Sequence, residues 1–205
     1  MDHRAKSRFA QLFGLIMVVL LSCQPGQHKI VNTAPLQDSL SLFDGAGEID
    51  SLEASEFIPS RVANIFIHCI ATREGTHTSP ERLKEFFKNE RHWDHYGYHW
   101  YITFDGKLHQ MQPMDGDMKL QYSELAWGAA GWNSTSIHIS VEGGLDVNGK
   151  PKDTRTEAQK VALHTIVAYY LAQDSGLIVR GHREVTNKAC PSFDVHEEEW
   201  EKIIE

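Results

Sequence analysis

Short apolar runs separated by polar residues are the first pattern in this chain. Residues 62–67 form an almost continuous apolar run, which is typical of a buried strand. Residues 97–102 are rich in aromatic residues, and the Asp-Gly pair at 105–106 predicts a hairpin into residues 107–111. Residues 136–141 alternate between apolar and polar positions and predict another strand. These runs indicate a β-sheet.

Helix signals alternate with these strands. The Ser-Pro pair at 79–80 predicts a helix start, with the serine as N-cap. The capping box at 156–159 opens a long helix, which we expect to end at Gly176. Residues 177–179 predict a short strand, and Asp194 predicts the cap of a final helix. Because strands and helices alternate, the sequence predicts an α/β fold with one mixed sheet.

The N-terminus has the residue order of an export signal. Three basic residues at positions 4, 6 and 8 precede an apolar run at 12–21, which is shorter than a typical membrane-spanning helix. The run ends in Leu-Ser-Cys, which resembles the bacterial lipobox. We therefore predict a lipoprotein signal peptide at residues 1–22 and a lipid on Cys23. Gln24, in place of an aspartate, indicates the outer membrane, facing the periplasm. Ordinary secretion with an incidental Cys23 is the alternative.

Residues 23–60 predict a flexible, lipid-anchored tether. They contain many glycine, proline, serine and acidic residues without sustained periodicity, so they offer little apolar area to bury. A chain of 205 residues fits one domain plus such extensions. The folded domain is therefore predicted at residues 61–205.

Composition narrows the function classes. The chain is 41% hydrophobic and 23% charged, which is ordinary for a globular protein. Its formal net charge is -8, whereas nucleic-acid-binding domains usually carry an excess of basic residues, so no nucleic-acid partner is expected. The three cysteines are an odd number and supply no complete disulfide framework.

A candidate metal site involves the stretch 180–194, in which His182 and Cys190 are separated by seven residues. Imidazole and thiolate are preferred zinc ligands, and His68, after the first apolar run, is the best third donor. If that strand continues, His68 and Cys69 point to opposite faces, so Cys69 packs in the core. Three donors leave a fourth position open for water, as in catalytic zinc sites. The alternative is a core hydrogen bond for His182 and an ordinary buried thiol for Cys190.

Several motifs resemble a known family in the correct order. The sequences IFIHCIAT, GYHWYI, NSTSIHISVEGG, GHREV and KACPSFD are similar to motifs of zinc-dependent N-acetylmuramoyl-L-alanine amidases, especially the phage lysozyme type. Peptidoglycan recognition proteins are more distantly similar. The resemblance covers residues 61–204. It implies a single domain with a central mixed β-sheet flanked by helices and a zinc cleft on the surface.

The resemblance also implies roles for individual residues. His68, His182 and Cys190 would hold one Zn²⁺ per chain. Tyr98 and Lys188 match the catalytic tyrosine and lysine. A tyrosine hydroxyl or a lysine ammonium aimed at the developing oxyanion would stabilise it, and the tyrosine would also relay a proton to the leaving amine.

One departure from the family concerns a carboxylate. Another branch has a catalytic glutamate in the strand that here spans residues 136–141, where the corresponding residue is Ser140. Glu142 lies two positions later, on the same strand face if pairing is regular. We expect the tyrosine-using branch, with Glu142 as an alternative supporting carboxylate.

Other polar and aromatic residues have weaker signals. Trp127, Trp132 and Asn133 are candidates for lining a glycopeptide groove, and packing on the sheet is the alternative. His99 is expected to be a hydrogen-bonded core group. The sequence places no ligand partner for the remaining histidines, which are His77, His92, His95, His109, His138, His164 and His196.

Together these features predict an envelope-anchored zinc hydrolase. Its partners would be peptidoglycan and, through the lipid, the membrane. The bond cleaved would be the amide between the lactyl group of N-acetylmuramic acid and L-alanine of the stem peptide. The alternative is a noncatalytic peptidoglycan-binding protein, a class usually marked by loss of the cysteine ligand, whereas Cys190 is present. A zinc peptidase that cuts within the stem peptide is a third possibility.

Overall fold

The computed structural model describes residues 57–200. The predicted signal peptide, the lipidation site Cys23 and nearly all of the predicted tether lie outside the described residues. Among residues 57–200, no helix is both long and apolar enough to cross a membrane. Phe57, the first described residue, packs against the main core.

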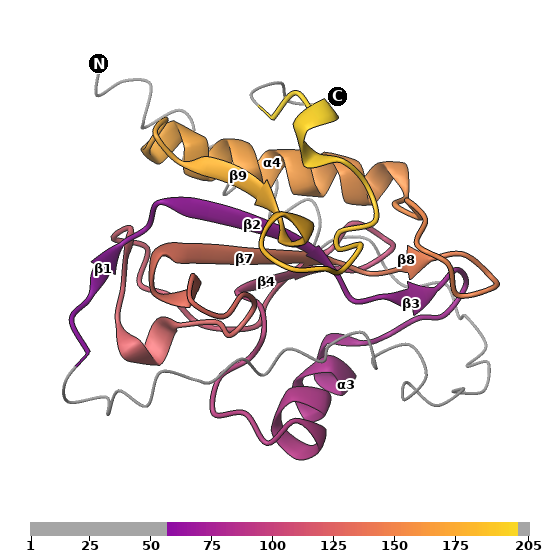
Figure 1. The fold of residues 1–205 in the computed structure, drawn as a ribbon, viewed down its shortest axis with the longest axis horizontal. Helices are drawn as coiled ribbons and strands as arrows, with labels where there is room; N and C mark the ends of the chain where they lie inside the picture. The colour runs from indigo at the N-terminus through magenta and orange to yellow at the C-terminus, as the bar shows by residue number, and fades with distance from the viewer. Residues whose placement is uncertain (1–56, 201–205) are drawn as a thin grey trace. The chain divides into compact units, whose positions relative to one another are not determined.

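A five-stranded mixed sheet forms the centre of the domain (Figure 1). Its strands, in spatial order, are β5 (Leu108–Gln110), β4 (Trp100–Ile102), β7 (Ser136–Val141), β2 (Asn64–Cys69) and β9 (Ile178–Gly181). All neighbours pair in parallel except the β4–β5 hairpin. Two small sheets pair β1 (Ser60–Arg61) with β6 (Lys119–Leu120) and β3 (Thr72–Arg73) with β8 (Gly144–Leu145). The predicted mixed sheet is confirmed.

The two central strands, β2 and β7, are buried along their whole length. This is expected for parallel strands that are covered on both faces. The alternate side chains of residues 136–141 therefore point to two faces of the sheet that are both buried, one apolar and one polar. The polar face of β7 carries Ser136, His138 and Ser140, all fully buried. In the β2–β7 register, Ser140 pairs with His68, which brings this polar face beside the predicted ligand.

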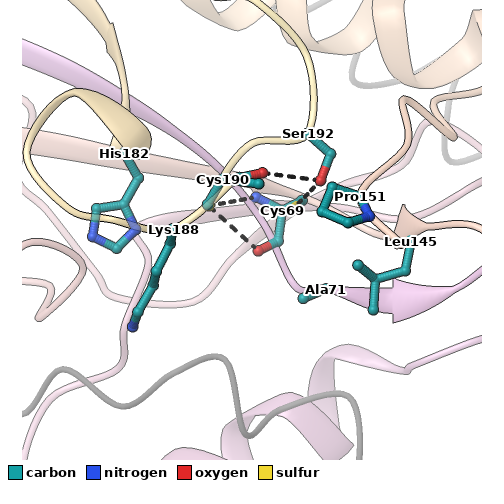
Figure 2. A pocket seen from close by; sticks show the side chains of 9 residues that line it. Cys69, Ala71, Leu145, Pro151, His182, Lys188, Cys190 and Ser192 are labelled. Carbon is teal, nitrogen blue, oxygen red and sulfur yellow. Dashed lines mark hydrogen bonds between the residues drawn. The ribbon is translucent and has the colours of Figure 1, made fainter. Parts of the chain in front are cut away.

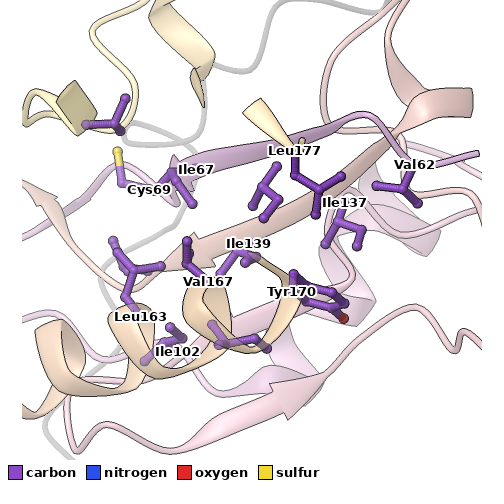
Figure 3. Close-up of a cluster of buried hydrophobic side chains, with 14 of the residues drawn as sticks. Val62, Ile67, Cys69, Ile102, Ile137, Ile139, Leu163, Val167, Tyr170 and Leu177 are labelled. Carbon is purple, nitrogen blue, oxygen red and sulfur yellow. The ribbon is translucent and has the colours of Figure 1, made fainter. Parts of the chain in front are cut away.

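Helix α4 (Glu157–Gln173) covers the apolar face of the sheet. Ile67 and Ile139 of the sheet pack with Leu163 and Val167 of the helix in one cluster (Figure 3). The capping box is confirmed, since the Thr156 side chain accepts a hydrogen bond from the Gln159 amide.

Two helix boundaries differ from the predictions. Helix α4 ends at Gln173, because Asp174 has an extended backbone (φ -148°) and stops the helix before Gly176. The predicted final helix is, over the described residues, only the 3₁₀ turn Val195–Glu197, which the Asp194 side chain caps. A short 3₁₀ turn makes fewer internal hydrogen bonds than an α-helix, so it depends on packing for its stability.

The other face of the sheet is covered by helix α3 (Pro80–Glu85) and the π-helical turn that continues it, Phe86–Glu90 (Figure 1). The Ser79 side chain caps α3, as predicted. Phe87 packs with Tyr98 and Tyr101 in a second buried cluster. Three further 3₁₀ turns are Tyr122–Glu124, Asn133–Thr135 and His182–Glu184. Tyr98, one of the catalytic candidates, belongs to this second cluster and packs against His68.

Two strands begin later than predicted. Strand β2 starts at Asn64 and includes His68 and Cys69, because pairing with β7 and β9 starts at Asn64. The two side chains point to opposite faces, and Cys69 belongs to the α4-side core, as expected. Strand β4 starts at Trp100, so Tyr98 lies in the preceding loop.

Candidate functional site

The three predicted zinc donors come together at one edge of the sheet. Strands β2 and β9 are parallel neighbours, so their carboxyl ends lie at the same edge. His68 lies near the end of β2, and His182 directly follows β9. The loop after His182 returns Cys190 to the same place. One ligand atom from each of these residues lies within 4.8 Å of the others.

The separations suit a tetrahedral metal ion. The Nδ1 atom of His68 is 3.8 Å from the Cys190 sulfur. Zinc–sulfur and zinc–nitrogen bonds of ~2.3 and ~2.0 Å at a tetrahedral angle place those two atoms about 3.5 Å apart. The ring centroids of His68 and His182 lie 4.6 Å apart. The donor set therefore fits one zinc ion.

The protonation states also suit metal binding. Burial lowers the pKa of His68 well below its usual value, and burial followed by the charge of Lys188 lowers the pKa of His182 to about 4. Both rings are then neutral at neutral pH, which is the ligand form. Burial raises the pKa of the Cys190 thiol in the absence of a metal. A bound cation reverses this preference because it stabilises the thiolate.

Lys188 lies beside the donors, at the polar end of a pocket (Figure 2). Its side chain runs alongside His182, while Ala71, Leu145 and Pro151 form the apolar end. The positive charge of Lys188 also lowers the pKa of the Cys190 thiol. Lys188 thus lines the same pocket as the donors His182 and Cys190.

Tyr98 packs against the ring of His68, with the ring centroids 5.1 Å apart. The Phe87 ring contacts Tyr98 edge-on at 5.6 Å, and the tyrosine is 1% exposed. Burial raises the pKa of Tyr98 well above its usual value. The phenol therefore keeps its proton at neutral pH and is a hydrogen-bond donor next to the predicted metal ligand His68.

Comparisons with known proteins agree with this geometry. A family model for N-acetylmuramoyl-L-alanine amidases matches residues 59–193. The chain belongs to this family. The endolysin of Escherichia phage T7 is 35% identical over 140 residues, which cover 67% of this chain and 85% of the endolysin.

Solved structures show the same fold. The amidase LysC from Clostridium intestinale URNW aligns with a TM-score of 0.52 at 22% identity, over 69% of this chain and 87% of LysC. Drosophila PGRP-LB aligns with a TM-score of 0.50 at 19% identity, over 64% of this chain and 75% of PGRP-LB. The domain is thus an N-acetylmuramoyl-L-alanine amidase related to peptidoglycan recognition proteins.

Glu142 anchors loops of the amidase. Its side chain is fully buried and accepts hydrogen bonds from the backbone amides of Thr78 and Phe104, the latter at 2.8 Å. His77 Nδ1 lies 2.9 Å from the same carboxylate. Burial raises the pKa of Glu142, and these hydrogen bonds oppose the increase. The carboxylate thus ties the loop before α3 to the β4–β5 turn.

The three candidate groove residues occupy different environments. Trp127 packs on His95, with the ring centroids 4.9 Å apart. Trp132 meets Phe66 edge-on at 5.8 Å, with the Arg180 guanidinium 5.4 Å from its ring. The Asn133 side-chain oxygen accepts the Ala129 amide at 2.8 Å, which closes its own loop. Of the three, Trp132 is linked most directly to the site, because Phe66 stacks on His138.

His99 and His138 complete the polar face. His99 is fully buried and hydrogen-bonded, as predicted: Nε2 donates to the Glu124 carbonyl at 3.0 Å, and Nδ1 accepts the His138 amide at 2.9 Å. The His138 ring lies 3.0 Å from His68, a contact that sequence reasoning missed. The contact depends on the register between β2 and β7, which the sequence alone does not give.

Proposed function

We propose that this amidase depends on one zinc ion held by His68, His182 and Cys190. The observation that supports the proposal is the convergence of three donor atoms, from two separated segments, within 4.8 Å. Two neutral imidazoles and one thiolate leave a net positive centre with a position free for water, as in catalytic zinc sites.

The bond cleaved is the amide between the lactyl group of N-acetylmuramic acid and the L-alanine of the stem peptide. An amide is a poor electrophile, and a bound zinc ion supplies polarisation of the carbonyl and a water with a pKa of ~7. The remaining requirement is stabilisation of the negative charge that develops on the carbonyl oxygen. We propose two side chains of this chain for that role.

Tyr98 and Lys188 are the catalytic residues in this proposal. The protonated phenol of Tyr98 lies against His68 and donates a hydrogen bond to the developing oxyanion. The Lys188 ammonium acts on the same charge from the pocket side of the donors. Because Tyr98 is shielded from water, its hydrogen bond is stronger than it would be in solvent.

The substrate is expected to extend from the zinc site along the face of the sheet that carries it. Trp132, Trp127 and Asn133 are proposed to line part of this path. The partial burial of Trp132 and the nearby cation of Arg180 support contacts with sugar or peptide carboxylate groups. The same surface suits the noncatalytic alternative, a peptidoglycan-binding protein, but that reading gives no reason for a complete donor set.

We further propose that the amidase is attached to the bacterial envelope. The basic, apolar and Leu-Ser-Cys order of residues 1–23 supports export and lipidation of Cys23, with the outer membrane as destination. A lipid anchor would hold the domain next to its substrate, with the residues between Cys23 and Phe57 as the tether.

Metal content and product analysis test the zinc proposal together. The wild-type protein is expected to contain one zinc per chain, whereas the Cys190→Ser variant contains much less. On purified sacculi, mass spectrometry should detect stem peptides with a free L-alanine amine only for the zinc-loaded wild type. Products cut within the stem peptide would indicate a peptidase, and binding without any product would indicate the noncatalytic alternative. Full zinc occupancy in Cys190→Ser would refute the ligand assignment.

A further inference from the structure

The ring of His138 lies directly behind the proposed zinc ligand His68. Both side chains are fully buried, and His68 Nε2 lies 3.0 Å from His138 Nδ1. His138 is two residues before Ser140, the register partner of His68, and therefore on the same face of the sheet. The contact thus follows from the pairing of β2 with β7.

The orientation of His68 assigns the proton in this contact. Its Nδ1 faces the Cys190 sulfur at 3.8 Å, so this nitrogen is the metal-binding one. A metal-binding nitrogen carries no proton, and a neutral imidazole then carries its proton on the other nitrogen. That nitrogen, Nε2, points at His138. His68 is the donor and His138 Nδ1 is the acceptor.

We propose that His138 is a positioning residue for the zinc ligand His68, acting through this hydrogen bond. The inference rests on the proposed zinc site. Metal-binding histidines generally donate their second ring N–H to an acceptor that fixes the ring and raises its basicity. In this chain the acceptor is a second imidazole.

The surroundings of His138 hold its ring in place. The His99 ring is parallel to it within 2°, at 5.8 Å between centroids, and Phe66 stacks on it at 5.7 Å. The backbone at Gly128 also approaches closely, because a Cβ atom there would lie 2.5 Å from His138 Nδ1. Because these contacts already fix the His138 ring, its hydrogen bond can orient His68 with little further loss of side-chain entropy when a metal binds.

Simple core packing does not account for this histidine. Its Nε2 atom is buried and has no hydrogen-bond partner among residues 57–200. A buried unpaired polar atom lowers the stability of the fold, a cost that an apolar ring of similar shape avoids. A polar ring at this position is therefore explained by its other nitrogen, Nδ1, which pairs with the proposed zinc ligand His68.

Two substitutions at His138 distinguish the effect of losing the hydrogen bond from the effect of changing the size of the side chain. His138→Phe keeps the ring and removes the acceptor, so the Kd for zinc, measured by competition with a chromophoric chelator, should rise about 10- to 100-fold. His138→Asn places an oxygen near the Nδ1 position and should recover most of the affinity. The Co²⁺-substituted protein should show shifted visible bands for the phenylalanine variant and near-normal bands for the asparagine variant.

A matched control and a measurement on the wild type complete the test. Phe66→Leu disturbs packing on the same ring without touching the acceptor, so it should lower the unfolding free energy but leave the zinc Kd within about twofold. In the ¹⁵N-labelled zinc-bound wild type, a scalar coupling between His68 Nε2 and His138 Nδ1 across the hydrogen bond is expected. Lack of that coupling, or an unchanged Kd in His138→Phe, overturns the inference. A wild type that binds no zinc overturns the proposed function instead.

Discussion

Tyr98 is a clear case of a residue whose chemistry is set by its neighbours. In water its phenol would be a weak acid with many hydrogen-bond partners. Here the rings of His68 and Phe87 enclose it, and burial raises its pKa well above the usual value. The hydroxyl is thereby kept protonated and excluded from bulk water. This is the state that a donor to a developing oxyanion needs.

The first prediction follows from that role. Tyr98→Phe should lower kcat on muramoyl-peptide fragments by about a hundredfold or more, because one preorganised donor is lost. Zinc content and fold should be retained, since the ring stays. The matched control is Tyr170→Phe, which removes a buried hydroxyl that accepts from Trp100 Nε1 on the α4 side of the sheet. That variant should keep its kcat. Equal kcat in wild type and Tyr98→Phe would direct attention to other groups, starting with Glu142.

At the scale of elements, one face of the sheet forms the hydrophobic core and the other carries the buried histidines. Its apolar face packs on α4 and supplies most of the buried hydrophobic cluster. Its polar face carries His68, His138 and His99 on three adjacent strands, β2, β7 and β4 with its preceding loop. Substitutions that affect only α4 are therefore expected to change stability rather than catalysis.

The cap of α4 tests this separation. Thr156 accepts the Gln159 amide at 3.1 Å and donates to the Phe104 carbonyl at 2.7 Å. Thr156→Ala should therefore lower the unfolding free energy by about 1–2 kcal/mol in urea titrations at fixed zinc concentration. Thr165→Ala is the control, because Thr165 bonds only within the helix and alanine has the higher helix propensity. Both variants should keep their kcat. A stability loss of equal size in both would show that the cap is not the cause.

At the scale of the whole molecule, the buried neutral histidines make the fold sensitive to acid. Burial lowers the pKa of His99 to about 3 from a usual value of 6.5. Between these pH values the unfolded chain binds a proton that the folded chain does not. Stability therefore falls as pH decreases through this window, and it is fully present above about pH 6.5.

This effect gives the third prediction. For the metal-free protein, His99 alone should remove about 3 kcal/mol of unfolding free energy between pH 6.5 and pH 4, at ~1.36 kcal/mol per pH unit. His99→Gln should be less stable at pH 7 yet lose correspondingly less over that interval. Urea titrations of both proteins across the range measure the difference. Parallel pH profiles would mean that His99 does not titrate with folding.

The fourth prediction concerns attachment of the whole chain. Cys23→Ala should move the protein from the membrane fraction to the soluble fraction, because the lipid would have no attachment site. Amidase activity on isolated sacculi should be unchanged, since residue 23 precedes the family match at residues 59–193. Mass spectrometry of the wild type should find the acyl groups. A wild type without lipid, distributed like the variant, would refute the anchoring proposal.

Much of the fold could be predicted from the sequence, because the signals for helix starts and strands are local. A capping box, a serine before a proline and apolar runs each act through neighbouring residues, so Ser79, Thr156 and the strands were predicted correctly. Ends set by tertiary packing were not, as the early stop of α4 at Gln173 shows. The family motifs also placed His68, His182 and Cys190 together, which the geometry supports.

Contacts between strands were decided only by the tertiary structure. The sequence shows His138 in an alternating strand and Glu142 directly after it, but it does not say which residues face them. Parallel pairing sets Ser140 opposite His68, and this register brings His138 to the zinc ligand. Glu142 meets the amides of Thr78 and Phe104 because two loops fold over the strand end. Hydrogen bonds between segments distant in sequence fix such neighbours, so the sequence of this protein determined the donor types and the fold assigned their partners.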